Sequence, residues 1–248
     1  HTRCSRDWSS DVCSSDLPGI GDRWTILPGA SRPGVFSGFG IMSRSMRQDA
    51  EDRISSLLTR LFPICRSLTG PGNRETLDIL GSIVPLVRHV VPSGFQAFDW
   101  TVPPEWHVRE AWIADANGTR LVDFAVSNLH VVGYSMPVRG RLSFDALRPH
   151  LHTLPSHPDA VPYRTSYFDR TWGFCLSERQ LAAFDPAAEY DVLIDSVLDE
   201  GGVLDYADAV HVGAEPREVL LSTYCCHPSL ANDNLSGLVL AVLLFDWI

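Results

Sequence analysis

The most restrictive feature of this sequence is an apolar run that stops at a histidine, crosses a short polar loop and resumes as a second apolar run. The segment is LLSTYCCHPSLANDNLSGLVLAVLLF, residues 220–245. The first run, which starts at Glu218, is nearly all apolar or small, as is typical of a strand buried on both faces of a sheet. The second run has the composition of a buried helix. A strand, a loop and a helix in this order predict an α/β fold.

Two helices are expected before this segment. Residues 49–64 have an apolar face at helical spacing, with acidic residues in the first turn where the helix dipole favours them. The residues of that face are Ile54, Leu57, Leu58 and Leu61. Residues 73–86 predict a second helix, in which Asn73 is the expected N-cap. Its buried side is expected to comprise Leu77, Ile79, Leu80 and Ile83.

Short β segments are expected from Val90 to Ser166. The pattern alternates on both sides of Asn117-Gly118, a dipeptide that predicts a β-hairpin because both residues tolerate positive φ. After a short helix capped by Ser177, further strands are expected within residues 190–212. Four tryptophans are interpreted as core aromatics of the β unit, with a ligand groove as the alternative: Trp100, Trp106, Trp112 and Trp172.

These patterns divide the chain into regions. Residues 1–17 lack periodicity and, when back-translated, resemble a sequencing adapter read in frame, so they are excluded from the fold argument. Residues 18–45 are rich in Pro, Gly and Ser and are expected to be an unstructured or non-native leader, with a native start at Met42 or Met46. We expect the N-terminal part of an α/β domain at 46–98, an inserted small all-β domain at 99–176, and the continuation of the α/β domain at 177–248.

The overall composition narrows the class of protein. A formal net charge of −10 leaves no basic stripe for phosphates, which argues against nucleic acid or an anionic membrane as a partner. The longest apolar run is shorter than the about 20 residues that a membrane-spanning helix needs. The six cysteines form no CxxC pair or disulfide-like framework. These features predict a cytoplasmic globular protein.

His227 and Asp233 are the candidate site residues. His227 ends the predicted strand and Asp233 precedes the predicted helix, so the loop can turn both toward one space. An imidazole and a carboxylate are suitable zinc ligands, but the spacing equally allows an Asp that caps the helix and a His that is hydrogen-bonded in the loop.

Other residues invite competing interpretations. Cys225 and Cys226 precede His227 and could supply a thiol nucleophile, although a buried apolar role is the commoner one. Three histidines in a Pro-punctuated loop could bind a metal, although surface or packing roles are favoured. They are His150, His152 and His157.

Five segments together resemble a known bacterial family. They are LFPICRSLTGPGNRETLDIL, FDWTVPPEW, SNLHVVGYSMPV, DAVPYRTSYFDRTWGFCLS and STYCCHPSLANDNLSG. The family is known as a domain of unknown function with a zinc aminopeptidase-like fold, and its members often occur near surface-polysaccharide genes. The resemblance, which extends from about Asp52 to the end, implies a zinc-aminopeptidase-like α/β sheet domain, truncated here, that carries a nested small all-β domain.

The resemblance also implies a function and a ligand set. His227 matches the first metal-binding His and Asp233 the Asp that bridges two zinc ions, while the general base and the remaining ligands are expected beyond Ile248. Ser229 stands where related peptidases have an Asp that orients the first His. The implied function is a zinc-dependent aminopeptidase-like hydrolase acting on a peptide or an amide-containing small substrate. This chain is expected to be an N-terminal fragment that binds zinc poorly and is inactive alone.

The alternative is a noncatalytic binding or scaffold protein of a surface-polysaccharide pathway. In that interpretation the metal site is degenerate and the tryptophans of the β unit form the recognition surface. A cysteine hydrolase is a third option.

Overall fold

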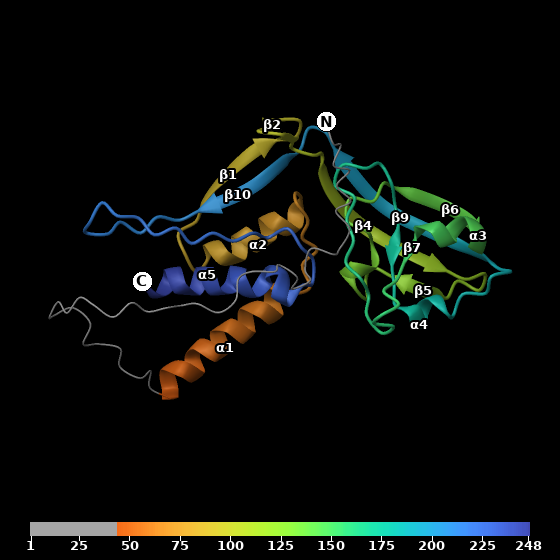
Figure 1. The fold of residues 1–248 in the computed structure, drawn as a ribbon, viewed down its shortest axis with the longest axis horizontal. Helices are drawn as coiled ribbons and strands as arrows, with labels where there is room; N and C mark the ends of the chain where they lie inside the picture. The colour runs from red at the N-terminus through yellow and green to blue at the C-terminus, as the bar shows by residue number, and fades with distance from the viewer. Residues whose placement is uncertain (1–43) are drawn as a thin grey trace, which may run out of the picture. The chain divides into compact units, whose positions relative to one another are not determined.

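The computed structural model describes residues 44–248, so the expectations for residues 1–17 and for nearly all of 18–45 lie outside the described part. The chain divides into two units after Asp52, and apart from the start of the first helix the following paragraphs concern residues 53–248. It is a mixed α/β structure with small sheets, which confirms the α/β class (Figure 1).

Three helices share one apolar cluster. They are α1 (Arg44–Leu61), α2 (Pro71–Gly81) and α5 (Ser236–Trp247) (Figure 1). Leu61, Leu80 and Val239, one from each helix, are at most 1% exposed and belong to this cluster. Ile54, Leu57 and Leu58 pack against it, which confirms the first predicted helix and its apolar face.

The second predicted helix begins earlier than expected. Pro71 is in its first turn, where a missing N–H costs nothing, and Gly70 is its N-cap residue. Asn73 therefore lies inside the helix, and the prediction that it is the N-cap is wrong. Its buried side-chain oxygen instead accepts a hydrogen bond from the backbone N–H of Ser67 at 3.2 Å. This hydrogen bond ties the loop 62–70 to the helix that follows it.

A four-stranded antiparallel sheet lies in the middle of the chain. Its strands are β4 (Glu105–Ala114), β5 (Arg120–Asp123), β6 (Val138–Ser143) and β9 (Glu189–Asp199), in the order β5-β4-β9-β6. Ile113, Val192 and Ile194 are at most 1% exposed and form the centre of its buried face. The sheet takes in β9, which lies on the C-terminal side of the boundary expected at residue 176.

Short elements accompany the sheet and share its core. They are α3 (Phe144–Leu147), β7 (Leu151–His152), β8 (Phe174–Cys175) and α4 (Glu178–Leu181). The predicted hairpin is confirmed, because β4 and β5 pair across Asn117-Gly118 and Gly118 has a φ of 81°. The predicted Ser177 cap is also confirmed, as Ser177 and Gln180 form a capping box at the start of α4.

The remaining strands form two small ladders. β1 (Val87–Pro92) pairs with β10 (Val203–Asp208), and β2 (Gln96–Ala97) pairs with β3 (Trp100–Thr101). The strands expected within residues 190–212 are thus present as β9 and β10. However, they belong to two different sheets.

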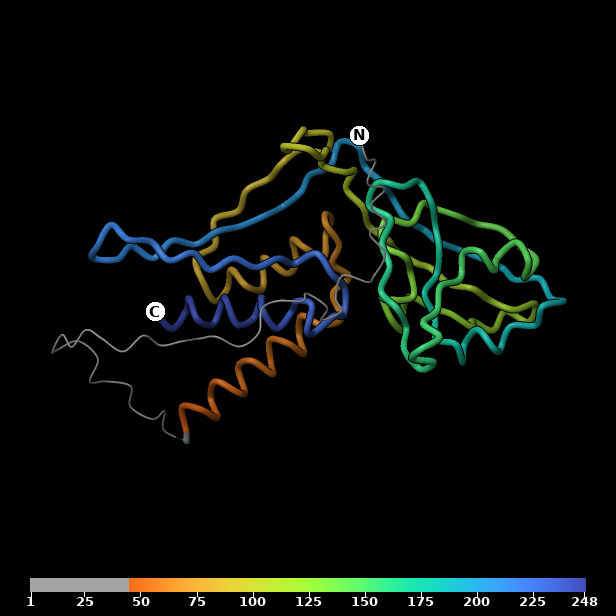
Figure 2. The backbone as a smooth tube through the Cα atoms, viewed as in Figure 1, coloured from red at the N-terminus to blue at the C-terminus, as the bar shows by residue number. Residues whose placement is uncertain are grey.

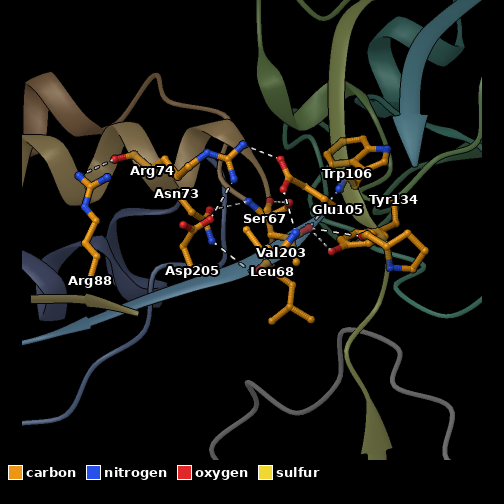
Figure 3. Close-up of polar contacts among 12 residues, drawn as sticks. Ser67, Leu68, Asn73, Arg74, Arg88, Glu105, Trp106, Tyr134, Val203 and Asp205 are labelled. Atoms are coloured by element: carbon orange, nitrogen blue, oxygen red, sulfur yellow. Dashed lines mark hydrogen bonds and ion pairs between the residues drawn. The ribbon is translucent and has the colours of Figure 1, made fainter. Parts of the chain in front are cut away.

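One arginine joins α2 to β4 and β10 (Figure 3). The Arg74 guanidinium donates to Glu105 at 2.5 Å and to Asp205 at 2.9 Å. Glu105 also accepts from the backbone N–H of Val203 at 3.1 Å. The hydrogen bond from Arg74 lowers the pKa of Glu105, so Glu105 stays charged at neutral pH.

The buried strand predicted from Glu218 to Cys226 is not formed. Residues 209–230 contain no strand, and Figure 2 shows this stretch running on from β10, turning back and returning to the turn before α5. Val219 and Leu220 are 90% and 87% exposed. A strand needs a neighbour for its backbone N–H and C=O groups, and no strand among residues 44–248 pairs with this segment. The segment thus has the composition of a buried strand but no pairing partner within residues 44–248.

The four tryptophans do not share one environment. Trp106 is 3% exposed, packs on Tyr134 at 5.7 Å between ring centroids, and donates its Nε1–H to the Ser135 carbonyl at 3.0 Å. The other three are only partly buried, although Trp172 does pack against the core cluster. The prediction of four core aromatics therefore holds fully for Trp106 alone.

Candidate functional site

The loop before α5 brings the two candidate residues together. His227 lies in the non-strand segment, and Asp233 lies in the irregular helical turn Ala231–Leu235. The distance from His227 Nε2 to Asp233 Oδ2 is 3.6 Å. The His227 side chain is 17% exposed and that of Asp233 is 41% exposed. The loop therefore presents one nearly buried imidazole beside one carboxylate that solvent can reach.

Contacts from the loop itself hold the Asp233 side of the site. The Tyr224 hydroxyl donates a hydrogen bond to Asp233 Oδ1. The Asn234 amide donates to the Thr223 hydroxyl at 3.2 Å, and the Ser236 hydroxyl donates to the Asn232 carbonyl at 3.5 Å. No side chain caps the N-terminus of α5. The interpretation of Asp233 as a simple helix cap is therefore not supported.

Residues distant in sequence hold the His227 side. The Arg66 Nε–H donates to the His227 carbonyl at 2.9 Å, and Arg66 Nη1–H donates to the Leu61 carbonyl at 2.6 Å. The Tyr163 hydroxyl lies 3.3 Å from His227 Nδ1. Burial lowers the pKa of His227, while Asp233 opposes this shift. A neutral imidazole is the form that can donate a lone pair to a metal.

The two cysteines are close to the site but poorly suited to nucleophilic attack. Cys226 Sγ lies 3.7 Å from His227 Nδ1. Burial raises the pKa of Cys226 to about 11 and also raises that of Cys225. A thiolate is the reactive form, so both residues remain largely protonated at neutral pH. The structure therefore favours the packing role for this pair.

The three histidines of the Pro-rich region take other positions. His150 stacks on Trp172 with ring centroids 3.7 Å apart, and its Nδ1 lies 2.9 Å from the Trp172 carbonyl oxygen. His157 contacts the Ser156 hydroxyl at 3.0 Å and is exposed. His152 is the last residue of β7 and is partly buried. Among residues 44–248, no group of three or more His, Cys, Asp and Glu side chains is placed to hold one metal ion.

His152 leads to a testable dependence of stability on pH. Burial, with a contribution from Arg164, lowers the pKa of His152 to about 4, whereas an unfolded chain has a value of about 6.5. Between these values the unfolded state binds a proton that the folded state does not, so stability falls as pH drops from 6.5 toward 4. Urea unfolding at pH 7 and pH 5 should show a smaller loss for His152→Gln than for the wild type. Equal losses would contradict this role of His152.

Three residues of this site were not identified from the sequence. Tyr224 lies three residues before His227, within the segment that indicated the site. Arg66 and Tyr163 lie in two other segments that carry the family resemblance. That common membership is a signal that could have grouped them, but their contacts with His227 depend on packing between distant parts of the chain.

Comparisons with known proteins match much of the chain. Residues 105–197 match the family described as a domain of unknown function (DUF2172). A protein of Clostridium acetobutylicum is 46% identical over 189 residues, which cover 75% of this chain and 43% of that protein. Its name describes a candidate polysaccharide biosynthesis protein with an aminopeptidase-like domain.

A solved structure gives a consistent result. A crystal structure of a candidate peptidase from Clostridium acetobutylicum has a TM-score of 0.78 and 42% identity. The match covers 81% of this chain and 48% of the other chain, so the chain spans about half the length of the relatives it matches. These matches agree with the family that the sequence motifs indicated: residues 105–197 match the family described as a domain of unknown function (DUF2172), and the chain is similar to a protein with an aminopeptidase-like domain and to a candidate peptidase.

Proposed function

We propose that the complete protein is a zinc-dependent aminopeptidase-like hydrolase, in which His227 and Asp233 supply two of the metal ligands. The observation that carries this proposal is the 3.6 Å separation of His227 Nε2 and Asp233 Oδ2 in the loop before α5. The names of the two relatives, one with an aminopeptidase-like domain and one a candidate peptidase, support the class of reaction.

The donor set fits a zinc ligand pair. Zinc binds His nitrogen and carboxylate oxygen at about 2.0–2.2 Å, so two ligand atoms of a tetrahedral ion lie about 3.4 Å apart. The observed separation of 3.6 Å needs almost no adjustment. Burial also keeps His227 in the neutral form that a ligand requires. Further ligands and the general base are proposed to lie in the part of the complete protein that corresponds to the unmatched part of its longer relatives.

The residues of this chain have distinct roles in the proposal. His227 and Asp233 would hold the ion, and Tyr224 would orient the Asp233 carboxylate through its hydrogen bond. Arg66 fixes the backbone at His227 by binding its carbonyl oxygen. A bound zinc ion would supply Lewis acidity toward the carbonyl group of a peptide or another amide-containing substrate. With only two ligands, the chain alone is proposed to bind zinc weakly and to be inactive.

The fold of the complete protein is part of the proposal. We propose an α/β sheet domain of the zinc aminopeptidase type that carries a nested β unit, and the pairing of β9 with β4 extends that unit past residue 176. The exposed segment 218–224 supports the larger sheet, since the composition of residues 218–226 suits a strand buried on both faces.

No helix within residues 44–248 combines the length and apolar character needed to cross a membrane.

Zinc content tests the assignment of the ligands. The purified complete protein should contain zinc, and its His227→Ala variant should contain much less, because one protein ligand is lost. Elemental analysis by mass spectrometry gives the stoichiometry. His157→Ala is the matched control, since His157 is exposed and its ring contacts Ser156 in the same loop. Equal zinc content in the wild type and His227→Ala would contradict the assignment.

A further inference from the structure

A tyrosine from the loop between β7 and β8 contacts the imidazole of His227. The Tyr163 hydroxyl lies 3.3 Å from His227 Nδ1, and the two rings meet edge to face at 5.0 Å and 60°. The two residues are 64 positions apart in the sequence. The opposite ring nitrogen, Nε2, is the atom that lies 3.6 Å from Asp233. His227 is thus held between a phenol on one side and a carboxylate on the other.

A ligating histidine needs an acceptor for its second ring nitrogen. Such histidines almost always donate the other ring N–H to an oxygen, which fixes both the tautomer and the ring orientation. Ser229 stands at the position where an orienting carboxylate is expected. Its hydroxyl instead donates to the Phe62 carbonyl at 2.9 Å, and its backbone has a φ of 33°. Ser229 is therefore committed to the end of α1 and does not orient His227.

Tyr163 is itself fixed by the β unit. Its hydroxyl lies 3.2 Å from the Tyr167 hydroxyl, and Tyr167 packs edge-on against Tyr134 at 5.3 Å and 83°. The Tyr134 hydroxyl in turn lies 2.6 Å from the Thr69 hydroxyl. A phenol that accepts a hydrogen bond can still donate its own proton. Tyr163 can therefore accept from His227 and donate to Tyr167 at the same time.

We propose that Tyr163 is a positioning residue that accepts the Nδ1–H of His227 and thereby leaves the Nε2 lone pair directed toward the Asp233 side of the site. Cys226 Sγ, at 3.7 Å from Nδ1, is a much weaker acceptor than a phenol oxygen. The β unit thus supplies the orienting group that the segment around Ser229 lacks. The role of Tyr163 in metal binding rests on the proposed function. Its hydrogen bond with His227 and the resulting tautomer do not depend on that function.

The tautomer can be measured without any metal. Long-range ¹H–¹⁵N spectra of the metal-free chain at pH 8 should show His227 protonated at Nδ1, with the signal assigned by its loss in His227→Gln. Tyr163→Phe keeps the ring but removes the acceptor, so His227 should shift toward the Nε2–H tautomer or a mixture. Tyr206→Phe is the matched control, because it removes the hydroxyl of a tyrosine in β10 that stacks on His89 at 4.8 Å. A tautomer that is unchanged in Tyr163→Phe would overturn the proposal.

Zinc affinity of the complete protein tests the consequence of this positioning. Competition with a chromophoric chelator should show binding weakened by about 10- to 100-fold in Tyr163→Phe and unchanged in Tyr206→Phe. A changed tautomer with unchanged zinc affinity would overturn the role of Tyr163 in metal binding. If the wild-type protein bound no zinc, the proposed function would fail, while the spectra would still decide whether Tyr163 orients His227. Circular dichroism of both variants would show that each is folded.

Discussion

Replacement of Gly70 by alanine is expected to lower the free energy of unfolding by about 3 kcal/mol or more. Gly70 is the N-cap residue of α2 and has φ 106° and ψ 179°, a conformation that only glycine adopts without strain. A Cβ atom there would also overlap the carbonyl oxygen of Trp106. Both the backbone conformation and the approach of β4 to this turn exclude a side chain. Urea unfolding followed by circular dichroism measures the effect.

Gly81→Ala is the matched control for this prediction. Gly81 is the last residue of α2, and a Cβ atom at this position would meet no other atom within 4 Å. Alanine is the better helix former, so Gly81→Ala should leave stability unchanged or increase it by up to about 1 kcal/mol. If Gly70→Ala were as stable as Gly81→Ala, this result would contradict the close approach of Trp106 to the turn at Gly70.

The second large effect is expected from Trp106→Ala, which should destabilise the protein by about 3 to 5 kcal/mol. Trp106 is 3% exposed and belongs to the core cluster of the four-stranded sheet. Its removal would leave a cavity beside Tyr134 and leave the Ser135 carbonyl without the hydrogen bond that it accepts from Nε1. The Trp106 backbone N–H also donates to the Thr69 hydroxyl at 3.1 Å, so Trp106→Ala is expected to destabilise the turn before α2 as well.

Trp112 on the same strand provides the comparison. It lies on the opposite face of β4, where it donates to Glu110 at 3.0 Å and stacks beneath Arg120 at 5.0 Å. These contacts are partly exposed, so Trp112→Ala should cost only about 1 kcal/mol. Chemical unfolding of both variants under the same conditions makes the comparison. Similar losses for Trp106→Ala and Trp112→Ala would contradict the assignment of the two faces.

Local patterns predicted the local elements of this protein well. The apolar spacing that includes Leu58 and Leu61 predicted α1, and the Asn117-Gly118 dipeptide predicted the β4–β5 hairpin. Ser177 predicted the cap of α4. Each of these signals depends on residues within a few positions of one another, where backbone conformation and side-chain hydrogen bonds act directly.

The errors arise where a distant partner decides the outcome. The segment 218–226 has the composition of a buried strand, yet composition cannot supply the neighbouring strand that its backbone requires. Asn73 has the side chain of a helix cap, but the turn at Gly70 moves the start of α2 and leaves Asn73 to bind Ser67. Trp106 and Trp112 were equivalent in the sequence, and only the packing of the sheet made Trp106 buried and left Trp112 partly buried.

The candidate site shows the same division between local sequence signals and contacts that depend on distant residues. The sequence predicted that the short loop between two apolar runs can turn His227 and Asp233 toward one space, and the structure places their side chains 3.6 Å apart. Their role as metal ligands stays a prediction. The sequence could not identify Arg66 or Tyr163, which lie 161 and 64 residues from His227. Those contacts exist only because the loop before α2 and the loop between β7 and β8 pack against the same histidine. Chain connectivity thus accounts for the pair of candidate ligands, and long-range packing accounts for the residues that hold them in place.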